Sequence, residues 1–352
     1  MNSGLAIAVN GQDDAELAQA ASVEVSEQLG QATTFCLRYG LDILSGDIPY
    51  LTDSRIDAGS EISVKVYLDN KPYCLVKGPV HGHSIHMEHG GSGSTIDVRG
   101  SDTSVKMDRE SQSVVWKDLT DSDAAQSIIS KYGYTPDVET TKAGHYENKH
   151  TLVQRESDLS FLQRLARRNG FNFWITSDPV GIETAHFRRP QLQSSVAVQL
   201  KINIDSPSVT SLDLNWDVEQ PTSISGMQLD LSSKSNMNLT IQKSPLLVLG
   251  DLSLTDITGD TRSLFLSAPS DDASDLQSRG EGAVIEADWF IHASCKTSVA
   301  AVMAIIRPYS VIELKGAGKR HSGKYFVSGV THTIDAMEHK MEIQLIRNGW
   351  GR

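Results

Sequence analysis

The stretch VQRESDLSFLQRLARRNGFNFWI, residues 153–175, is the most informative part of the sequence for the fold. Its pattern predicts a capped helix followed by a strand. Four apolar side chains recur three and four residues apart and therefore share one helical face: Leu159, Leu162, Leu165 and Ala166. Ser157 is expected to cap this helix, over residues 158–168, and Asn169-Gly170 supplies a left-handed exit. The aromatic residues 171–175 then predict a strand.

Most of the remaining sequence alternates apolar and polar residues with a period of two, which is typical of strands. Residues 62–68 alternate in this way and stop at Asp69-Asn70, a hairpin turn. Similar patterns predict strands over 80–87, 94–98, 212–218, 227–231, 237–241, 325–334 and 341–346. The chain is therefore expected to be mainly β, in closed or nearly closed barrels that leave few open edges.

Helices are expected in only three places. Ser122 or Asp123 is predicted to cap a helix that runs to Lys131, with Gly133 as its stop. The second helix is residues 158–168, and a weaker third is expected within 278–294. Residues 268–279 are polar and acidic, so they are expected to be an exposed loop or linker.

The composition excludes several classes of protein. A net charge of −12 over 352 residues argues against nucleic-acid binding, which requires a basic face. No apolar run reaches the roughly 20 residues that span a bilayer, and the first residues lack the features of a signal peptide. Cys36, Cys74 and Cys295 are scattered and odd in number, which favours reduced thiols in a protein made in the cytoplasm.

No convergent set of reactive groups is evident, so the sequence predicts neither an enzyme nor a cofactor. His81 and His83 are weak candidates for metal ligands, since they share one face of a strand, but they lack a third ligand with clear spacing. The glycine-rich run at 90–94 lacks the following Lys and helix of a phosphate loop, and is expected to be a hairpin tip.

Four separated segments carry a resemblance to a known family. They are residues 21–40 with 51–68, the stretch GSDTSVKMDRE at 100–110, the RESD and FLQRLARRNGF motifs within 153–175, and residues 322–351. In this order they resemble the bacteriophage late-control-D family, the baseplate hub proteins of contractile tails and injection systems, which includes the hub portion of VgrG proteins. The positions that match the family's motifs are Arg155, Glu156, Ser157, Asp158, Phe161, Leu162, Leu165, Gly170, Gly323, Tyr325, Val327, His332, Arg347 and Asn348.

The resemblance implies a mainly β fold with α+β insertions: two small antiparallel β-barrels of tube-protein type and a helix-containing α/β subdomain. The expected division is a first barrel over 1–115, an α/β subdomain over 116–200 with helices near 123–132 and 158–168, and a β segment of the second barrel over 201–267. The expected division ends with a linker and helical patch over 268–300 and with the closing strands of the second barrel over 301–352. The matched positions are expected to be structural rather than catalytic.

The function implied by the resemblance is that of a trimeric symmetry adaptor, which joins a hexameric inner tube to a trimeric spike in the baseplate of a tail or tail-like particle. The expected partners are two further copies, the inner tube or a tube-initiator protein, the spike and other baseplate components, with no nucleic acid and no membrane insertion. Because the sequence stops at 349–352, just after the last hub strand, the spike is expected to be a separate polypeptide. A tail-associated cell-wall hydrolase and an exported glycan-binding β-protein are the alternatives.

Overall fold

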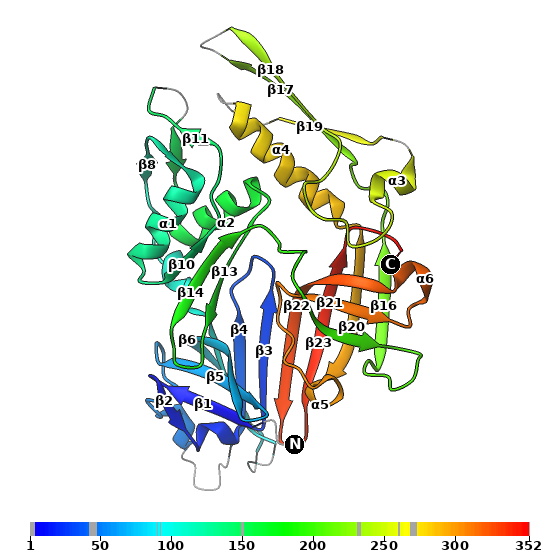
Figure 1. The fold of residues 1–352 in the computed structure, drawn as a ribbon. Coiled ribbons are helices and arrows are strands. Elements are labelled where there is room, and N and C mark those ends of the chain that lie inside the picture. The colour runs from blue at the N-terminus through cyan, green and yellow to red at the C-terminus, as the bar shows by residue number, and fades with distance from the viewer. Residues whose placement is uncertain are drawn as a thin grey trace.

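The computed structural model describes residues 4–41, 48–89, 91, 93–148, 151–230, 234–259, 261–267 and 273–351. Strands dominate, and the largest sheet extends through both the N-terminal and the C-terminal parts of the chain (Figure 1). Its strands in the N-terminal part are β1 (Leu5–Val9), β2 (Gln12–Asp14), β3 (Ser22–Gln28), β4 (Thr34–Gly40), β5 (Glu61–Leu68), β6 (Lys71–His86) and β7 (Thr95–Ser101). Its strands in the C-terminal part are β15 (Val196–Lys201), β16 (Ser211–Trp216), β20 (Ile291–Ser298), β21 (Val311–Lys315), β22 (Gly323–Asp335) and β23 (His339–Arg347).

The long strand β22 joins the two parts of this sheet. Its first residues pair with β21, and beyond a bulge at 327–329 the same edge pairs with β3, from Gly329 opposite Gln28 to Asp335 opposite Ser22. Because β3 occupies this edge, neither part closes on itself, and no closed barrel is present in the described residues. The mainly β, largely antiparallel fold is confirmed, whereas the prediction of two barrels is not.

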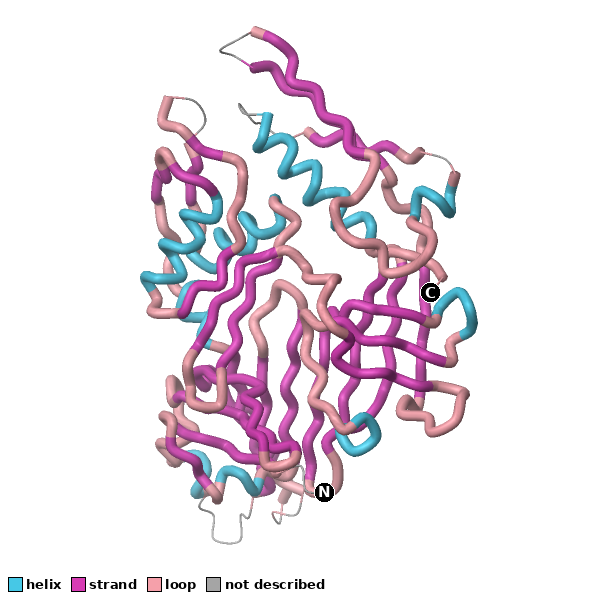
Figure 2. The backbone as a smooth tube through the Cα atoms, in the orientation of Figure 1, coloured by secondary structure: helices cyan, strands magenta, loops and turns pink. Residues whose placement is uncertain are grey.

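An α/β region covers one end of the N-terminal sheet (Figure 2). Helices α1 (Asp121–Lys131) and α2 (Asp158–Arg168) pack on the three-stranded sheet of β10 (Thr135–Val138), β14 (Glu183–Arg188) and β13 (Asn172–Ser177). Two short strand pairs flank it, β8 (Val114–Trp116) with β12 (Leu152–Gln154) and β9 (Leu119–Thr120) with β11 (Gly144–His145). The predicted apolar face of α2 is buried here, together with Phe161.

The start of α1 corrects the sequence prediction. Thr120, rather than Ser122 or Asp123, is the N-cap, since its hydroxyl accepts from the Asp123 amide while the Asp123 carboxylate accepts from the Thr120 amide. This reciprocal capping box begins the helix at Asp121. Gly133, with φ of 80°, ends it as predicted.

An arm projects from the C-terminal sheet at the top of Figure 1. It consists of helix α4 (Ala273–Asp288) packed under the sheet of β18 (Ser235–Ile241), β17 (Ser223–Asp230) and β19 (Ser263–Leu266). Within 201–267, therefore, β16 joins the main sheet but these three strands form a sheet of their own. The expected loop over 268–279 is helical from Ala273 onward, and its first five residues lie outside the described ranges.

Glycines in α4 made this helix hard to predict, because glycine has a low helix propensity. A Cβ on Gly282 would lie 2.8 Å from the Arg167 carbonyl oxygen, and one on Gly280 would lie 2.5 Å from the Leu239 side chain. The glycines thus allow α4 to contact α2 and the arm sheet closely. The remainder of the expected 278–294 helix is instead the start of β20.

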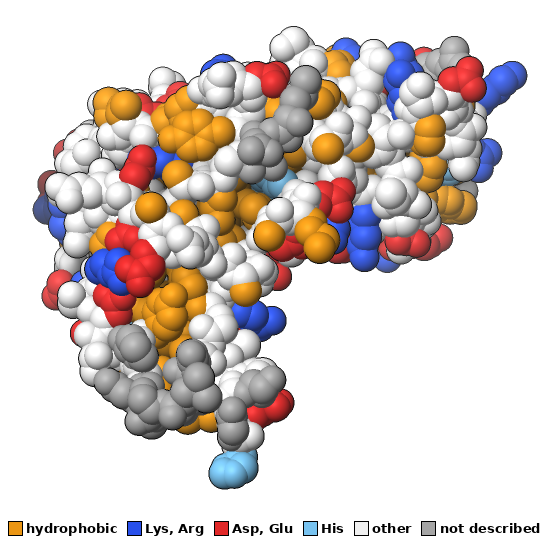
Figure 3. All heavy atoms as spheres, turned by 90° about the horizontal axis from the view of Figure 1, so that it is seen from below, with side chains coloured by type: hydrophobic (Ala, Val, Ile, Leu, Met, Phe, Trp, Pro, Cys, Tyr) orange, Lys and Arg blue, Asp and Glu red, His pale blue; other side chains and the backbone are white. Residues whose placement is uncertain are grey.

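Short helices occupy several connections: α3 (Leu254–Thr258), α5 (Val299–Val302), α6 (Gly318–His321) and the 3-10 turns Leu17–Gln19, Pro49–Leu51 and Thr103–Asp108. Within the described ranges, no helix has both the length and the apolar character that crossing a bilayer would require. Seen from below, the molecule is bent, with one concave side, and apolar side chains are exposed in several separate patches (Figure 3).

Candidate assembly site

An ionic cluster fastens the N-terminal and C-terminal parts of the main sheet together. Arg307, in the connection between α5 and β21, donates from Nε to the Glu27 carboxylate of β3 at 2.8 Å. Its other nitrogens donate to the carbonyl oxygens of Cys74 at 2.7 Å and Leu75 at 3.0 Å, beside a bulge of β6. One guanidinium of the C-terminal part thus binds two strands of the N-terminal part. We call Glu27, Arg307, His332 and His339 the seam cluster.

Two histidines complete the seam cluster inside the protein. His332 is fully buried, with Nε2 3.3 Å from a Glu27 carboxylate oxygen and Nδ1 3.0 Å from Nε2 of His339. Burial lowers the pKa of His332, and burial beside His332 lowers the pKa of His339 to about 3. Burial alone would raise the pKa of Glu27, but Arg307 and His332 hold it below its usual value. The cluster therefore holds one carboxylate, one guanidinium and two neutral rings at neutral pH.

The RESD motif positions the start of α2. Ser157 accepts from the Ser160 amide at 3.2 Å and its hydroxyl donates to Asp108. Asp158 is buried and accepts from Lys131, Tyr132 and Gln154 at 2.7–2.9 Å. Burial raises its pKa, but these donors lower it overall.

The other matched positions of this motif fill the helix or lie at its surface. Glu156 accepts from Arg164, Arg155 is exposed, and Phe161, Leu162 and Leu165 are buried. The motif as a whole is an arrangement for packing α2.

A second buried ionic cluster links the α/β region to the arm, and sequence reasoning missed it. Asp121 is fully buried and accepts from His145 at 2.8 Å and from Asn169 at 2.7 Å, with Nε of Arg168 at 3.2 Å. Arg168 also donates to Asp275 of α4. Asp275 lies in the stretch 268–279 that was expected to be a loop or linker, and no local pattern signals its pairing with Arg168.

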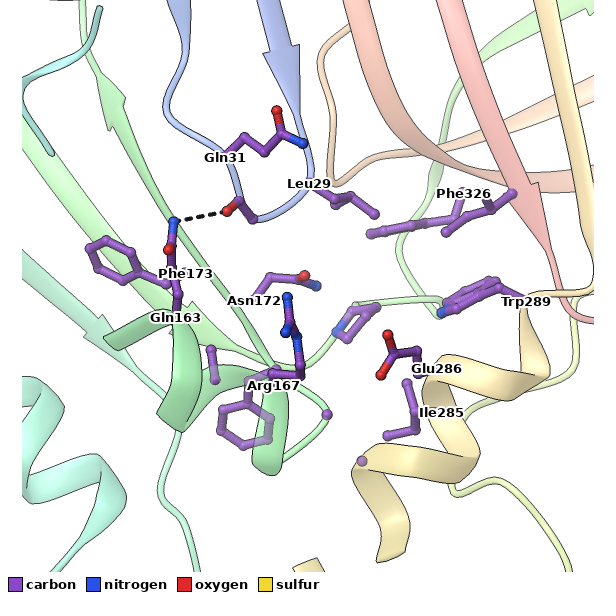
Figure 4. A pocket seen from close by; sticks show the side chains of 17 residues that line it. Leu29, Gln31, Gln163, Arg167, Asn172, Phe173, Ile285, Glu286, Trp289 and Phe326 are labelled. Atoms are coloured by element: carbon purple, nitrogen blue, oxygen red, sulfur yellow. Dashed lines mark hydrogen bonds between the residues drawn. The ribbon is translucent and has the colours of Figure 1, made fainter. Parts of the chain in front are cut away.

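A cleft of about 300 Å³ lies at the junction of α2, α4 and the main sheet (Figure 4). Gln163 donates to the Gly30 carbonyl at 3.0 Å across one side, and the Trp289 ring stacks on Phe326 with centroids 5.9 Å apart on the other. Gly170, with φ of 66°, is the matched position that lines it. The cleft has a mixed lining, including Arg167 and Glu286, and no arrangement of reactive groups.

The C-terminal motif forms a buried clamp on the segment 247–251. Arg347 donates to the Leu249 carbonyl from Nε at 2.9 Å and Nη2 at 2.8 Å, and lies 5.1 Å over the Tyr325 ring. Asn348 accepts from the Leu249 amide and donates to the Leu247 carbonyl. A Cβ on Gly323 would lie 2.7 Å from Arg347, so glycine leaves room for the guanidinium. Val327 is buried nearby in the sheet core.

His81 and His83 lie on opposite faces of β6 rather than on one, because a bulge between Val80 and Gly82 interrupts the alternation. His81 lies with Cys36 and Arg99 along a hollow of about 270 Å³, whereas a ring nitrogen of His83 is 2.7 Å from the Ile56 carbonyl oxygen. Among the described residues, no three His, Cys, Asp or Glu side chains are grouped as metal ligands. Of the 90–94 run, Gly90 and Ser92 lie outside the described residues.

Cys74 and Cys295 are buried, which makes them inert thiols rather than nucleophiles. Burial raises the pKa of Cys74 to about 11 and that of Cys295 to about 12. Both therefore stay protonated at neutral pH.

The motif residues of α2 and of the C-terminal strands are not brought together into one site; they stabilise two separate junctions.

Comparisons with known proteins identify the architecture. A family model described as the Alg8 N-terminal domain matches residues 2–336. The tail protein of Neisseria meningitidis has a similar structure, with a TM-score of 0.69 and 12% identity over 99% of this chain and 97% of that one. A prophage tail protein of Shewanella oneidensis has a TM-score of 0.69 and 14% identity, with 99% of each chain covered.

Injection-system proteins share the fold more distantly. A type VI secretion component of E. coli has a TM-score of 0.59 and 13% identity, covering 98% of this chain and 79% of that one. No curated protein matches the sequence. The tail-type fold expected from the motifs is confirmed, and membership of the late-control-D family stays a prediction.

Proposed function

We propose that this chain, which belongs to the family described as the Alg8 N-terminal domain, is a structural baseplate hub of a contractile tail or injection particle, because its fold is that of tail proteins. In this role three copies form a ring that joins a hexameric inner tube to a trimeric spike. Its proposed partners are the tube or tube-initiator protein, the spike and other baseplate components. It acts by positioning these partners, without a catalytic step.

The proposal rests on structural similarity to tail proteins over nearly the whole length of both chains. Two tail proteins of different bacteria align with 99% of this chain and with 97% and 99% of their own length. The similarity therefore extends to the arm and the α/β region as well as the main sheet. For the alternative, a hydrolase domain inserted within residues 1–352 would need a segment outside this alignment.

The arm offers a surface suited to assembly. The outer face of its sheet, which faces away from α4, exposes 56% of Met227, 47% of Leu229 and 59% of Phe265. The neighbouring side chains on this face are the uncharged Asn236, Asn238 and Thr240. An exposed apolar face without charge is typical of the centre of a protein interface.

Strand β16 offers a second such surface. Among the described residues β16 pairs with β20 alone and so forms one edge of the main sheet. It carries neither proline nor lysine, so the backbone groups on this edge are suited to pairing with another chain. Both features support incorporation into a larger ring.

The proposal is tested by purifying a tagged copy from its native lysate, with mass spectrometry and negative-stain microscopy of the material. Tube, sheath and spike proteins are expected to co-purify in particles that are lost when the gene is deleted and restored by the wild-type gene. Met227→Asp with Phe265→Asp should fail to restore them, whereas Val180→Asp, at a side chain on the β13–β14 turn that is 82% exposed, should succeed. A soluble protein without tail partners, and intact particles after deletion, would refute the proposal.

A further inference from the structure

A groove of about 800 Å³ lies beside the C-terminal clamp, between the segment 247–250 and residues 313–324. Its apolar lining is open to solvent, since Ile204 is 42% exposed and Leu247 is 44% exposed. This size and mixed lining are typical of sites that bind another molecule.

The walls of the groove are held in place by buried contacts. Arg347 and Asn348 hold the segment that carries Leu247 through its backbone, as described above. On the other side the backbone approaches so closely at Gly316, where φ is 89°, that a Cβ would lie 1.7 Å from the Ile202 carbonyl oxygen. The groove is therefore a preformed feature of the fold.

The rim of the groove is basic, in a chain with a net charge of −12. Lys315, Lys319 and Lys324 line it, and the opposing carboxylate among the lining residues is Glu313, whose oxygen is 3.5 Å from Nζ of Lys315. Within the described residues, neither Lys319 nor Lys324 has a carboxylate within 4.0 Å, and both are exposed. The rim thus carries positive charge that the described part of the protein leaves unmatched.

We infer that this groove receives an extended segment of a partner protein that carries both acidic and apolar side chains. The acidic side chains would contact Lys319 and Lys324, and the apolar ones would cover Ile204 and Leu247. A peptide satisfies both halves of the lining, whereas a nucleic acid or a simple anion would leave the apolar half exposed. The strongly acidic remainder of the chain also disfavours a nucleic acid.

The inference goes beyond the proposed hub function and is tested on the purified full chain alone. Fluorescence anisotropy would follow a labelled peptide of alternating Glu and Leu, about eight residues long, which spans about 26 Å when extended. We expect saturable binding that weakens as salt rises from about 50 mM to about 500 mM. Control peptides of alternating Gln and Leu, or Lys and Leu, should bind at least about tenfold more weakly.

Charge reversal locates the site. Lys319→Glu with Lys324→Glu should weaken binding of the Glu–Leu peptide by about tenfold or more, while leaving thermal stability unchanged because both side chains are exposed. The matched control, Lys71→Glu with Lys142→Glu, changes the same number of exposed lysines in other parts of the fold and should bind like wild type.

Several results would overturn the inference. These are absence of binding, equal binding by the groove variant, or groove-dependent binding of single-stranded DNA or anionic vesicles in preference to the peptide. Self-association abolished by the groove variant would assign the groove to a second copy and would likewise overturn it. Failure of the particle experiment would leave these measurements unaffected, so the two hypotheses are tested separately.

Discussion

Arg307→Met is the substitution that most directly tests the seam cluster. The methionine approximates the length of the arginine stem but removes its hydrogen bonds to Glu27, Cys74 and Leu75. Glu27, only 6% exposed, would then keep a buried negative charge beside neutral rings. Breaking a buried ion pair in this way costs about 3–5 kcal/mol, because the remaining charge has lost its counter-ion.

The double variant Glu27→Met with Arg307→Met separates the charge effect from packing. Since it removes both charges, it should recover at least about half of the lost free energy of unfolding. The carbonyls of Cys74 and Leu75 would still lack their donor, so recovery should stay incomplete.

Guanidinium-induced unfolding at pH 7, followed by intrinsic fluorescence, measures both free energies. Hydrogen exchange should also show faster exchange in β3 and in β22 between Gly329 and Asp335, where the two parts of the sheet pair. A loss of less than about 1 kcal/mol in Arg307→Met, or a double variant less stable than the single one, would show that this ion pair does not stabilise the junction.

Three further predictions concern other contacts. The pKa of His339 is about 3 in the folded protein and about 6.5 when unfolded, so the unfolded state binds more protons below pH 6.5. This group alone should lower the free energy of unfolding by about 2 kcal/mol between pH 7 and pH 5. His339→Gln should reduce this dependence in pH-resolved denaturation, leaving the part that comes from the lowered pKa of His332, and an unchanged slope would contradict the assignment. Gly282→Ala should destabilise the protein by about 1–3 kcal/mol in thermal melts, although alanine has the better helix propensity, because its Cβ would clash with α2. The control Gln277→Ala, on the exposed side of α4, should be nearly neutral. Equal melting temperatures for the two variants would be inconsistent with this packing. Ser157→Ala should lower the free energy of unfolding by about 1–2 kcal/mol in chemical denaturation, because α2 loses its N-cap. A loss below a few tenths of a kcal/mol would argue against a stabilising role of this cap.

Local patterns predicted the individual elements well. The helix at 158–168, its Ser157 cap and its Gly170 exit follow from spacing and end residues alone, and the structure has them at these positions. The hairpin at Asp69-Asn70 and the closing pair of strands β22 and β23 follow from alternation and turn residues in the same way. These elements are determined by residues close together in the sequence.

The pairing of distant elements could not be read in the same way. Strand β22 pairs with both β21 and β3 because it is long and carries a bulge. This pairing joins the N-terminal and C-terminal parts of the sheet instead of closing two barrels. The glycines of α4 argued against a helix, but they are required by its contacts with α2 and the arm sheet. The buried partners of Asp121 and Arg307 come from segments far apart in sequence, where no local pattern signals them.

The central claim, that this chain is a hub between tube and spike, is tested most directly by cryo-electron microscopy of intact particles. We predict that density for this fold lies between the tube and the spike in three copies around the particle axis, with the arms and the β16 edges at contacts between subunits. Particles with the fold absent from this junction, or present elsewhere in another copy number, would contradict the account.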